Sequence, residues 1–242
     1  MKTIASKKFW QTLAVKSQVT LTDTAALEAS QLQGRGLQGM EYVVEEILHV
    51  VENDNLCEWF ICRIVNPDQE LYLVAKLFAS EVQLKVYYAP PAVISGTRQE
   101  QIEAANTFIF RDAKDMKQYM HLKHAALIDW DFNIDEKVDK VRFLQKGNIE
   151  LTGKGYYQGD LSVSKIGQPL LVTISEYLAQ KQCSDPEIMI FEVGSYNSKV
   201  GGVIKVLLGA PVNEFEVSIL NAKKSPIVSG SSGLDARAYN AR

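Results

Sequence analysis

The segment that decides the fold runs from Gly39 to Pro91 and reads GMEYVVEEILHVVENDNLCEWFICRIVNPDQELYLVAKLFASEVQLKVYYAPP. Apolar and polar residues alternate along it, and turn-forming residues at 52–55 and 66–69 interrupt the alternation. Alternation with a period of two is typical of strands that bury one face, and short polar turns between such strands indicate an antiparallel meander. The segment therefore predicts four neighbouring antiparallel strands.

The four strands are expected at 41–51, 56–65, 70–77 and 82–88. The second differs from the others because it is apolar on both faces. Trp59 and Ile61 alternate along it with Phe60 and Cys62. A strand of this kind is normally buried on both sides, so we expect it to be central or covered by another element.

The rest of the chain mixes the signals of short helices and of further strands. Helices are expected at 22–32, 97–106, 112–126 and 173–183, and strands at 149–152, 187–193, 203–208 and 215–220. The segment 138–144 is ambiguous, with strand favoured by the turn that follows it. The helix at 173–183 is expected because Thr173 and Glu176 have the spacing of a capping box. The predicted fold class is therefore α+β, with mainly antiparallel β-sheet and a few short helices.

Four regions are expected along the chain. They are a partly helical lead-in at 1–38, the meander with helices at 39–127, a second β-rich module at 128–221 and a disordered tail at 222–242. The two modules contain a similar short segment, since the strands at 84–90 and 204–211 both end in Ala-Pro. Two interpretations stay open: a duplicated β-module, or a common strand stop that recurs by chance.

Composition narrows the class of protein. The chain has 242 residues, of which 46% are hydrophobic and 23% charged, and its formal net charge is −3. Such values are ordinary for a soluble globular protein, and scattered Lys and Arg give no basic surface for nucleic acid. Cys57, Cys62 and Cys183 lack the spacing of a redox or zinc motif. With no long apolar run, the sequence predicts a cytoplasmic protein that does not insert into a membrane.

A metal site is the first candidate for chemistry. Asp129 and Asp131 belong to an array of oxygen ligands suited to a hard cation. It is not an EF-hand, because Ile134 stands where the loop needs glycine and Lys140 where it needs glutamate. A solvated acidic loop is the alternative interpretation.

Two histidines could complete such a site. His121 and His124 are three residues apart on the expected helix at 112–126, a spacing that can put two imidazoles on one side. A mixed site with Asp129 and Asp131 would then bind a divalent metal ion. The alternative is that both histidines are ordinary surface residues.

Aromatic residues supply the candidate binding surface, which consists of Trp59, Tyr87, Tyr88 and Trp130. Tyr87 lies on the side of its strand that also carries Gln83 and Lys85, which suggests exposure to solvent. An exposed aromatic patch on a sheet is a common recognition surface. Half-buried packing residues are the alternative.

These observations lead to two functional hypotheses. The leading one is a non-catalytic protein-binding or scaffolding module without a cofactor, since no complete catalytic constellation is readable in the sequence. The other is a metal-dependent hydrolase or phosphoesterase, in which a divalent ion held by the Asp and His residues activates water. Neither the partner nor the oligomeric state can be read from the sequence.

Overall fold

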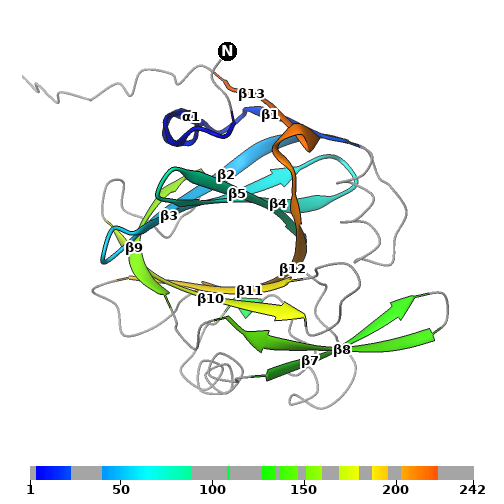
Figure 1. The fold of residues 1–242 in the computed structure, drawn as a ribbon. Helices are drawn as coiled ribbons and strands as arrows, with labels where there is room; N and C mark the ends of the chain where they lie inside the picture. The colour runs from blue at the N-terminus through cyan, green and yellow to red at the C-terminus, as the bar shows by residue number, and fades with distance from the viewer. Residues whose placement is uncertain are drawn as a thin grey trace, which may run out of the picture.

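The structure is a computed structural model that describes residues 4–22, 40–88, 108–109, 127–134, 137–146, 151–159, 169–179, 187–195 and 203–222. These residues form one extended antiparallel sheet with two short helical segments (Figure 1). The helical segments are α1 (Lys7–Thr12) and the 3-10 helix η1 (Glu214–Glu216). Among the described residues, no helix has the length and apolar character needed to cross a membrane.

Thirteen strands are assigned in the described residues. They are β1 (Gln18–Leu21), β2 (Glu41–Glu52), β3 (Cys57–Val65), β4 (Glu70–Phe78), β5 (Glu81–Tyr88), β6 (Phe108–Ile109), β7 (Leu127–Ile134), β8 (Lys137–Gln145), β9 (Leu151–Gln158), β10 (Leu170–Ala179), β11 (Glu187–Ser195), β12 (Val203–Val212) and β13 (Val217–Leu220). The strands β2 to β5 are the expected meander, and each of their ends lies within one residue of its predicted position. The prediction of a mainly antiparallel sheet is therefore confirmed.

The sheet closes on itself. β5 pairs with β12, β12 with β11, β11 with β10, β10 with β9, and β9 returns to β2. Figure 1 shows the resulting ring of strands, which we call the closed ring. Closure joins strands from both predicted modules in one sheet. It also makes direct neighbours of β5 and β12, which contain most of the two similar segments that end in Ala-Pro. A duplication of the two modules stays a prediction.

The closed ring has a core on each of its faces. Its inner face buries side chains such as Val50, Trp59 and Met189, while its outer face packs against Phe9 and Trp10 of α1. The strand β3 contributes to both cores, so the prediction that it is covered on both sides is confirmed.

Glycine allows two strands of the ring to approach closely. A Cβ atom on Gly209 of β12 would lie 2.2 Å from the carbonyl oxygen of Val86 in β5. A Cβ atom on Gly155 of β9 would lie 2.4 Å from Cγ2 of Val172 in β10. Only a residue without a side chain fits such contacts. These glycines therefore permit the close pairing of β12 with β5 and of β9 with β10 that closes the ring.

The expected helix at 173–183 is wrong over the residues that the structure describes there, because 170–179 form β10. This strand pairs with β11 from Leu170 to Leu178. The side chains of Val172 and Ile174 are buried in the inner core, so the segment has the alternation of a strand. Pairing of a β-branched segment on both edges outweighs the local preference of the capping-box sequence.

Other expected elements have mixed outcomes. The acidic segment expected as a loop is part of β7, which pairs with β8 along its whole length. The helix α1 was not expected, and Ser6 caps it by accepting a hydrogen bond from the Phe9 amide. The expected helices at 22–32, 97–106 and 112–126 lie outside the described residues, except for Thr22. The tail beyond residue 222 also lies outside them.

Candidate functional site

Three of the four aromatic residues predicted to form a binding surface are buried. Trp59 and Tyr87 have no exposed surface and lie in the inner core, and Tyr88 is buried in the outer core. The expectation of exposure is therefore wrong for these three. For Tyr87 the cause is closure of the sheet, which turns the polar side of β5, with Lys85, toward the inside of the ring. Tyr88 lies on the opposite side of β5 and packs in the outer core. Trp130 lies in β7, and its side chain is outside the description.

The predicted metal ligands fall partly outside the description. Asp129 and Asp131 are in β7, opposite Arg142 and Lys140 of β8, and their side chains are not described. His121 and His124 lie outside the described residues. Within the described residues, no cluster of three or more His, Cys, Asp or Glu side chains could hold a metal ion. The metal hypothesis stays a prediction.

Charged side chains gather at one end of the ring interior. We call this group the paired end; it consists of Lys76, Lys85, Glu176 and Glu187. Lys85 Nζ lies 2.8 Å from Glu176 Oε1 and also contacts Glu187, while Lys76 Nζ lies 2.5 Å from Glu176 Oε2. These residues come from β4, β5, β10 and β11, so both halves of the chain build the cluster.

Pairing controls the protonation of these buried groups. Burial alone would lower the pKa of Lys85, but Glu176 and Glu187 outweigh it and hold that pKa above its ordinary value. Burial alone would raise the pKa of Glu176, but the two lysines hold it below its ordinary value. Lys85 and Glu176 are therefore both charged at neutral pH, and the charge of each compensates the buried charge of the other.

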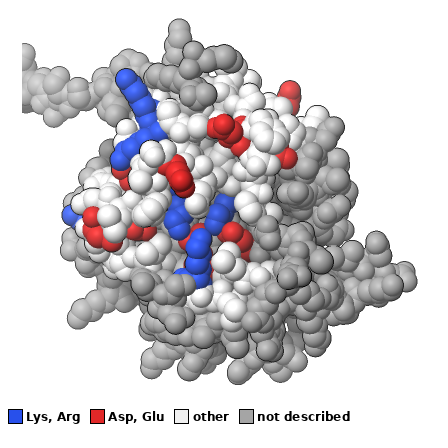
Figure 2. Space-filling view, in the orientation of Figure 1, with Lys and Arg blue, Asp and Glu red and all other residues white. Residues whose placement is uncertain are grey.

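A second charged group lies at the opposite end of the ring interior. We call it the Arg63 end; it consists of Glu45, Glu46, Arg63, Glu70, Tyr72 and Lys205. The Arg63 guanidinium contacts three carboxylates at 2.9 to 3.1 Å, those of Glu45, Glu46 and Glu70. Figure 2 shows basic and acidic side chains close together near the middle of the visible face.

Between these two ends the ring interior is filled by apolar side chains. Trp59, Tyr87, Met189 and Leu207 all point inward and have no exposed surface. A closed sheet of this size can either fill its interior with side chains or hold one small ligand. In the layer that these residues form, the interior is a packed core.

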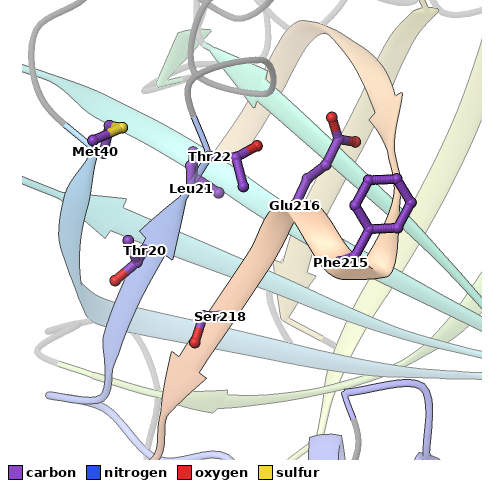
Figure 3. Close-up of a pocket in the computed structure, with 7 residues that line it drawn as sticks. All are labelled: Thr20, Leu21, Thr22, Met40, Phe215, Glu216 and Ser218. Atoms are coloured by element: carbon purple, nitrogen blue, oxygen red, sulfur yellow. The ribbon is translucent and has the colours of Figure 1, made fainter.

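The outer surface carries a shallow pocket of about 340 Å³ beside β1 and β13 (Figure 3). Its lining residues are Thr20, Leu21, Thr22, Met40, Phe215, Glu216 and Ser218. Two large apolar lining residues are exposed, since Phe215 is 79% exposed and Met40 is 39% exposed. Leu220, two residues after the lining residue Ser218 in β13, is 70% exposed. We call Met40, Phe215 and Leu220, with the pocket, the edge patch.

A local capping arrangement positions Phe215. Glu216 accepts hydrogen bonds from the backbone amide of Asn213 at 2.7 Å and from its side-chain Nδ2 at 3.0 Å. This closes the short helix η1 and orders the turn from β12 into β13. Phe215, between the two glutamates of that turn, is therefore held outward on an ordered element.

The strand β13 is firmly attached on one edge. It pairs with β1 from Val217 to Leu220, and Asn221 then binds the backbone of Ala14 and Thr12 through its side chain. Within the described part of the chain, β1 is the strand with which β13 pairs. The edge patch therefore lies beside a rigid strand at the end of the sheet.

Sequence reasoning missed the edge patch, because it assigned Phe215 to an ordinary strand. A signal was present, since a large aromatic residue stands between Glu214 and Glu216 just after an Ala-Pro strand stop. Neither models of protein families, nor curated proteins, nor solved structures match this chain.

Proposed function

We propose that the protein is a non-catalytic protein-binding module and that the edge patch is its binding surface. One observation carries the proposal: Phe215 in η1, which lines the pocket, and Leu220 at the end of β13 are both more than two-thirds exposed. Phe78, Tyr156 and Leu178 of the ring are also exposed, but less than Phe215 and Leu220, and they do not line this pocket. Exposed apolar patches next to a concave surface are typical of interaction sites.

An extended peptide segment suits this surface. A strand at the end of a sheet can accept a further strand from a partner, whose alternate side chains then enter neighbouring pockets. An apolar side chain of the partner would fill the pocket next to Phe215 and Met40. Main-chain hydrogen bonds to β13 would supply affinity without specificity.

Charge favours a partner with basic residues. Glu41 and Glu214 are exposed next to lining residues of the pocket, and none of those lining residues is Lys or Arg. Complementary charge accelerates association and excludes acidic partners. We therefore propose an extended segment in which apolar and basic residues alternate.

The compartment of this interaction is proposed to be the cytoplasm. Cys57 and Cys62 are free thiols, and they are buried on opposite faces of β3. Burial raises the pKa of Cys57 to about 11. Unpaired, protonated thiols are compatible with a reducing environment.

Selection from a displayed library of random 12-residue peptides tests the proposal. Peptides are selected on the wild-type protein and then titrated by fluorescence polarisation against F215D. We expect selected peptides to alternate apolar and basic residues, and we expect F215D to weaken their binding by about tenfold or more, which corresponds to about 1.4 kcal/mol.

The matched control is F78D. Phe78 is also a large exposed aromatic residue, at 48% exposure, but it lies at the end of β4 and does not line the pocket. Binding that survives in F78D and is lost in F215D supports the edge patch. Peptides that bind both variants as well as the wild type would show that the edge patch is not the binding surface.

A further inference from the structure

The edge patch lies at an open edge of the sheet. β13 pairs with β1 on one edge, and no strand in the described part of the chain pairs with its other edge. Thr20 and Ser218 lie opposite each other on these two strands, and both are exposed residues that line the pocket (Figure 3). An open strand edge is a template for a further strand, and proteins commonly cover it. The residues that follow β13 in the chain are a candidate for this cover.

The chain after β13 starts from a fixed point beside this edge. Asn221 Oδ1 accepts a hydrogen bond from the Ala14 amide at 3.2 Å. The Ala222 amide donates a hydrogen bond to Ser17 Oγ at 3.0 Å. The segment 223–242 therefore continues from the end of β13 that is farther from the pocket.

The composition of this segment matches the chemistry of the edge patch. It contains four Lys or Arg residues and one Asp, so its charge is opposite in sign to the net charge of −3 of the whole chain. Its first residues combine basic and apolar side chains, since Lys223 and Lys224 precede Ile227 and Val228. The exposed glutamates beside the pocket supply the complementary charge.

The length of chain brings an apolar residue of the segment to the pocket. A two-residue turn at 222–223, of the kind that joins antiparallel neighbours, would return the chain along the open edge of β13. Counted from that turn, Ile227 would lie opposite Ser218, which lines the pocket. Opposite residues in an antiparallel pair share a face, so the Ile227 side chain would meet the pocket. Pro226 has no N–H to donate, which an outermost strand tolerates.

We propose that residues 223–228 occupy the edge patch of their own chain as an autoinhibitory strand, with Ile227 at the pocket. The short connection to β13 gives the segment an effective concentration in the millimolar range, so even weak contacts keep it docked. A partner peptide must displace it before it binds. The inference rests on the proposed function, because partner and segment compete for one surface. It limits the predicted disordered tail to the residues beyond 228.

Limited proteolysis of the whole chain tests whether the segment is docked. Trypsin cuts after Lys224 and after Arg237, and mass spectrometry gives the rate of each cut. An effective concentration of about 1 mM and a dissociation constant of about 0.1 mM give about tenfold protection. We therefore expect F215D and I227D to accelerate the cut after Lys224 about tenfold. The cut after Arg237 should keep its rate, because that bond lies beyond the docked segment.

Two matched controls accompany these variants. L234D makes a similar change in the same tail but beyond the docked segment, and F78D changes an exposed aromatic residue outside the pocket. Both should be cut after Lys224 at the wild-type rate. I227D alters no residue of the described fold, so it decides the question even if F215D fails to fold.

Two results would overturn the proposal. One is an equal rate of cutting after Lys224 in I227D and in the wild type. The other is protection that grows with protein concentration, because the segment of a second copy would then be the occupant.

Peptide binding separates this inference from the proposed function. I227D should bind the selected peptides about tenfold more tightly than the wild type, because the competing segment is weakened. Peptides that bind both proteins equally, with no protection of the bond after Lys224, would overturn the inference and leave the proposed function intact. Protection that F215D removes, without any selected peptide, would support the docked segment and contradict the proposed function.

Discussion

The two ends of the ring interior contain the same kinds of residue in different arrangements. At the paired end, Lys85 contacts two buried carboxylates. At the Arg63 end, Lys205 contacts a tyrosine, and its nearest described carboxylate is at 4.0 Å. The pKa of Lys85 is raised and that of Lys205 is lowered. The carboxylates of Glu176 and Glu187 therefore favour the charged form of Lys85, whereas burial outweighs the neighbouring carboxylates at Lys205 and disfavours its charged form.

Exposure separates the two ends further. Glu176 and Lys85 are about 5% exposed or less, so removing one partner leaves an uncompensated charge away from water. The carboxylates at the Arg63 end are 26% to 43% exposed, so water can replace a lost contact. The four predictions below test this difference, from the largest expected effect to the smallest.

The largest effect is expected for E176Q. The substitution removes the negative charge that both Lys76 and Lys85 contact, so we expect the free energy of unfolding to fall by about 3 kcal/mol. Urea unfolding followed by circular dichroism measures the change. E45Q is the matched control at the Arg63 end and should cost less than about 1 kcal/mol. Equal losses in the two variants would remove the distinction between the two ends.

The next effect concerns closure of the ring that encloses both ends. In G209A the new methyl group would meet the Val86 carbonyl oxygen and the Tyr87 ring, and we expect a loss of about 1 to 3 kcal/mol in the free energy of unfolding. G194A is the control, since a Cβ there has nothing within 4 Å. It should be neutral or stabilising by up to about 1 kcal/mol, because alanine loses less backbone entropy than glycine. If G209A unfolds at the same urea concentration as the wild type, the close approach of β12 to β5 is not needed for closure of the ring.

Both ends should make stability increase with pH, but in different pH windows and for opposite reasons, since the folded state favours the charged form of Glu176 and disfavours that of Lys205. The pKa of Glu176 is lowered from 4.5, so its stabilisation is present above pH 4.5 and is lost as the pH falls through the folded value. The pKa of Lys205 is lowered from 10.5, so its charged form is disfavoured in the folded state, and stability should increase as the pH rises from the folded value toward 10.5. Each contribution changes by at most about 1.4 kcal/mol per pH unit.

Two variants test which residue causes each change in stability, with urea unfolding repeated across the pH range. E176Q should reduce the loss of stability at acidic pH, and K205M should remove the increase at alkaline pH. The same alkaline slope in K205M and in the wild type would show that Lys205 has an ordinary pKa in the folded protein.

The smallest effect is expected for E70Q. Removing this carboxylate eliminates a charge that favours protonation of Lys205, so the pKa of Lys205 should fall further and the alkaline increase in stability should begin at a lower pH. The free energy of unfolding should change by less than about 1 kcal/mol, because the Glu70 side chain is 43% exposed. E81Q, at the exposed start of β5, should change neither quantity. An alkaline increase that begins at the same pH in E70Q and in the wild type would show that Glu70 does not influence the pKa of Lys205.

The local pattern of the sequence was sufficient for the meander and insufficient for the later strands. In β2 to β5, alternation and turn residues agree, and neighbours along the chain are neighbours in the sheet. In β10, the capping-box spacing of Thr173 and Glu176 competed with alternation of Val172 and Ile174. Pairing with β11 and β9 decides in favour of a strand. Neither pairing can be read from the local pattern of this segment.

The candidate sites were less predictable than the strands. Lys76, Lys85, Glu176 and Glu187 are up to 111 positions apart in the chain, and no spacing rule connects them. Phe215 was readable as a strand residue, but its exposure depends on the capped turn that holds it outward. Sites built from several strands need the register of the whole sheet before their members can be recognised.

The sequence by itself determined the antiparallel meander at 41–88 and the two-sided burial of β3, because side-chain alternation and apolar content act locally. Only the tertiary structure decided which side of each strand faces the interior. Closure of the ring through β9 and β12 made the polar side of β5 an inner face, buried Tyr87 and brought Lys85 to Glu176. The physical reason is that alternation says which residues share a face, whereas pairing of distant strands decides what that face meets.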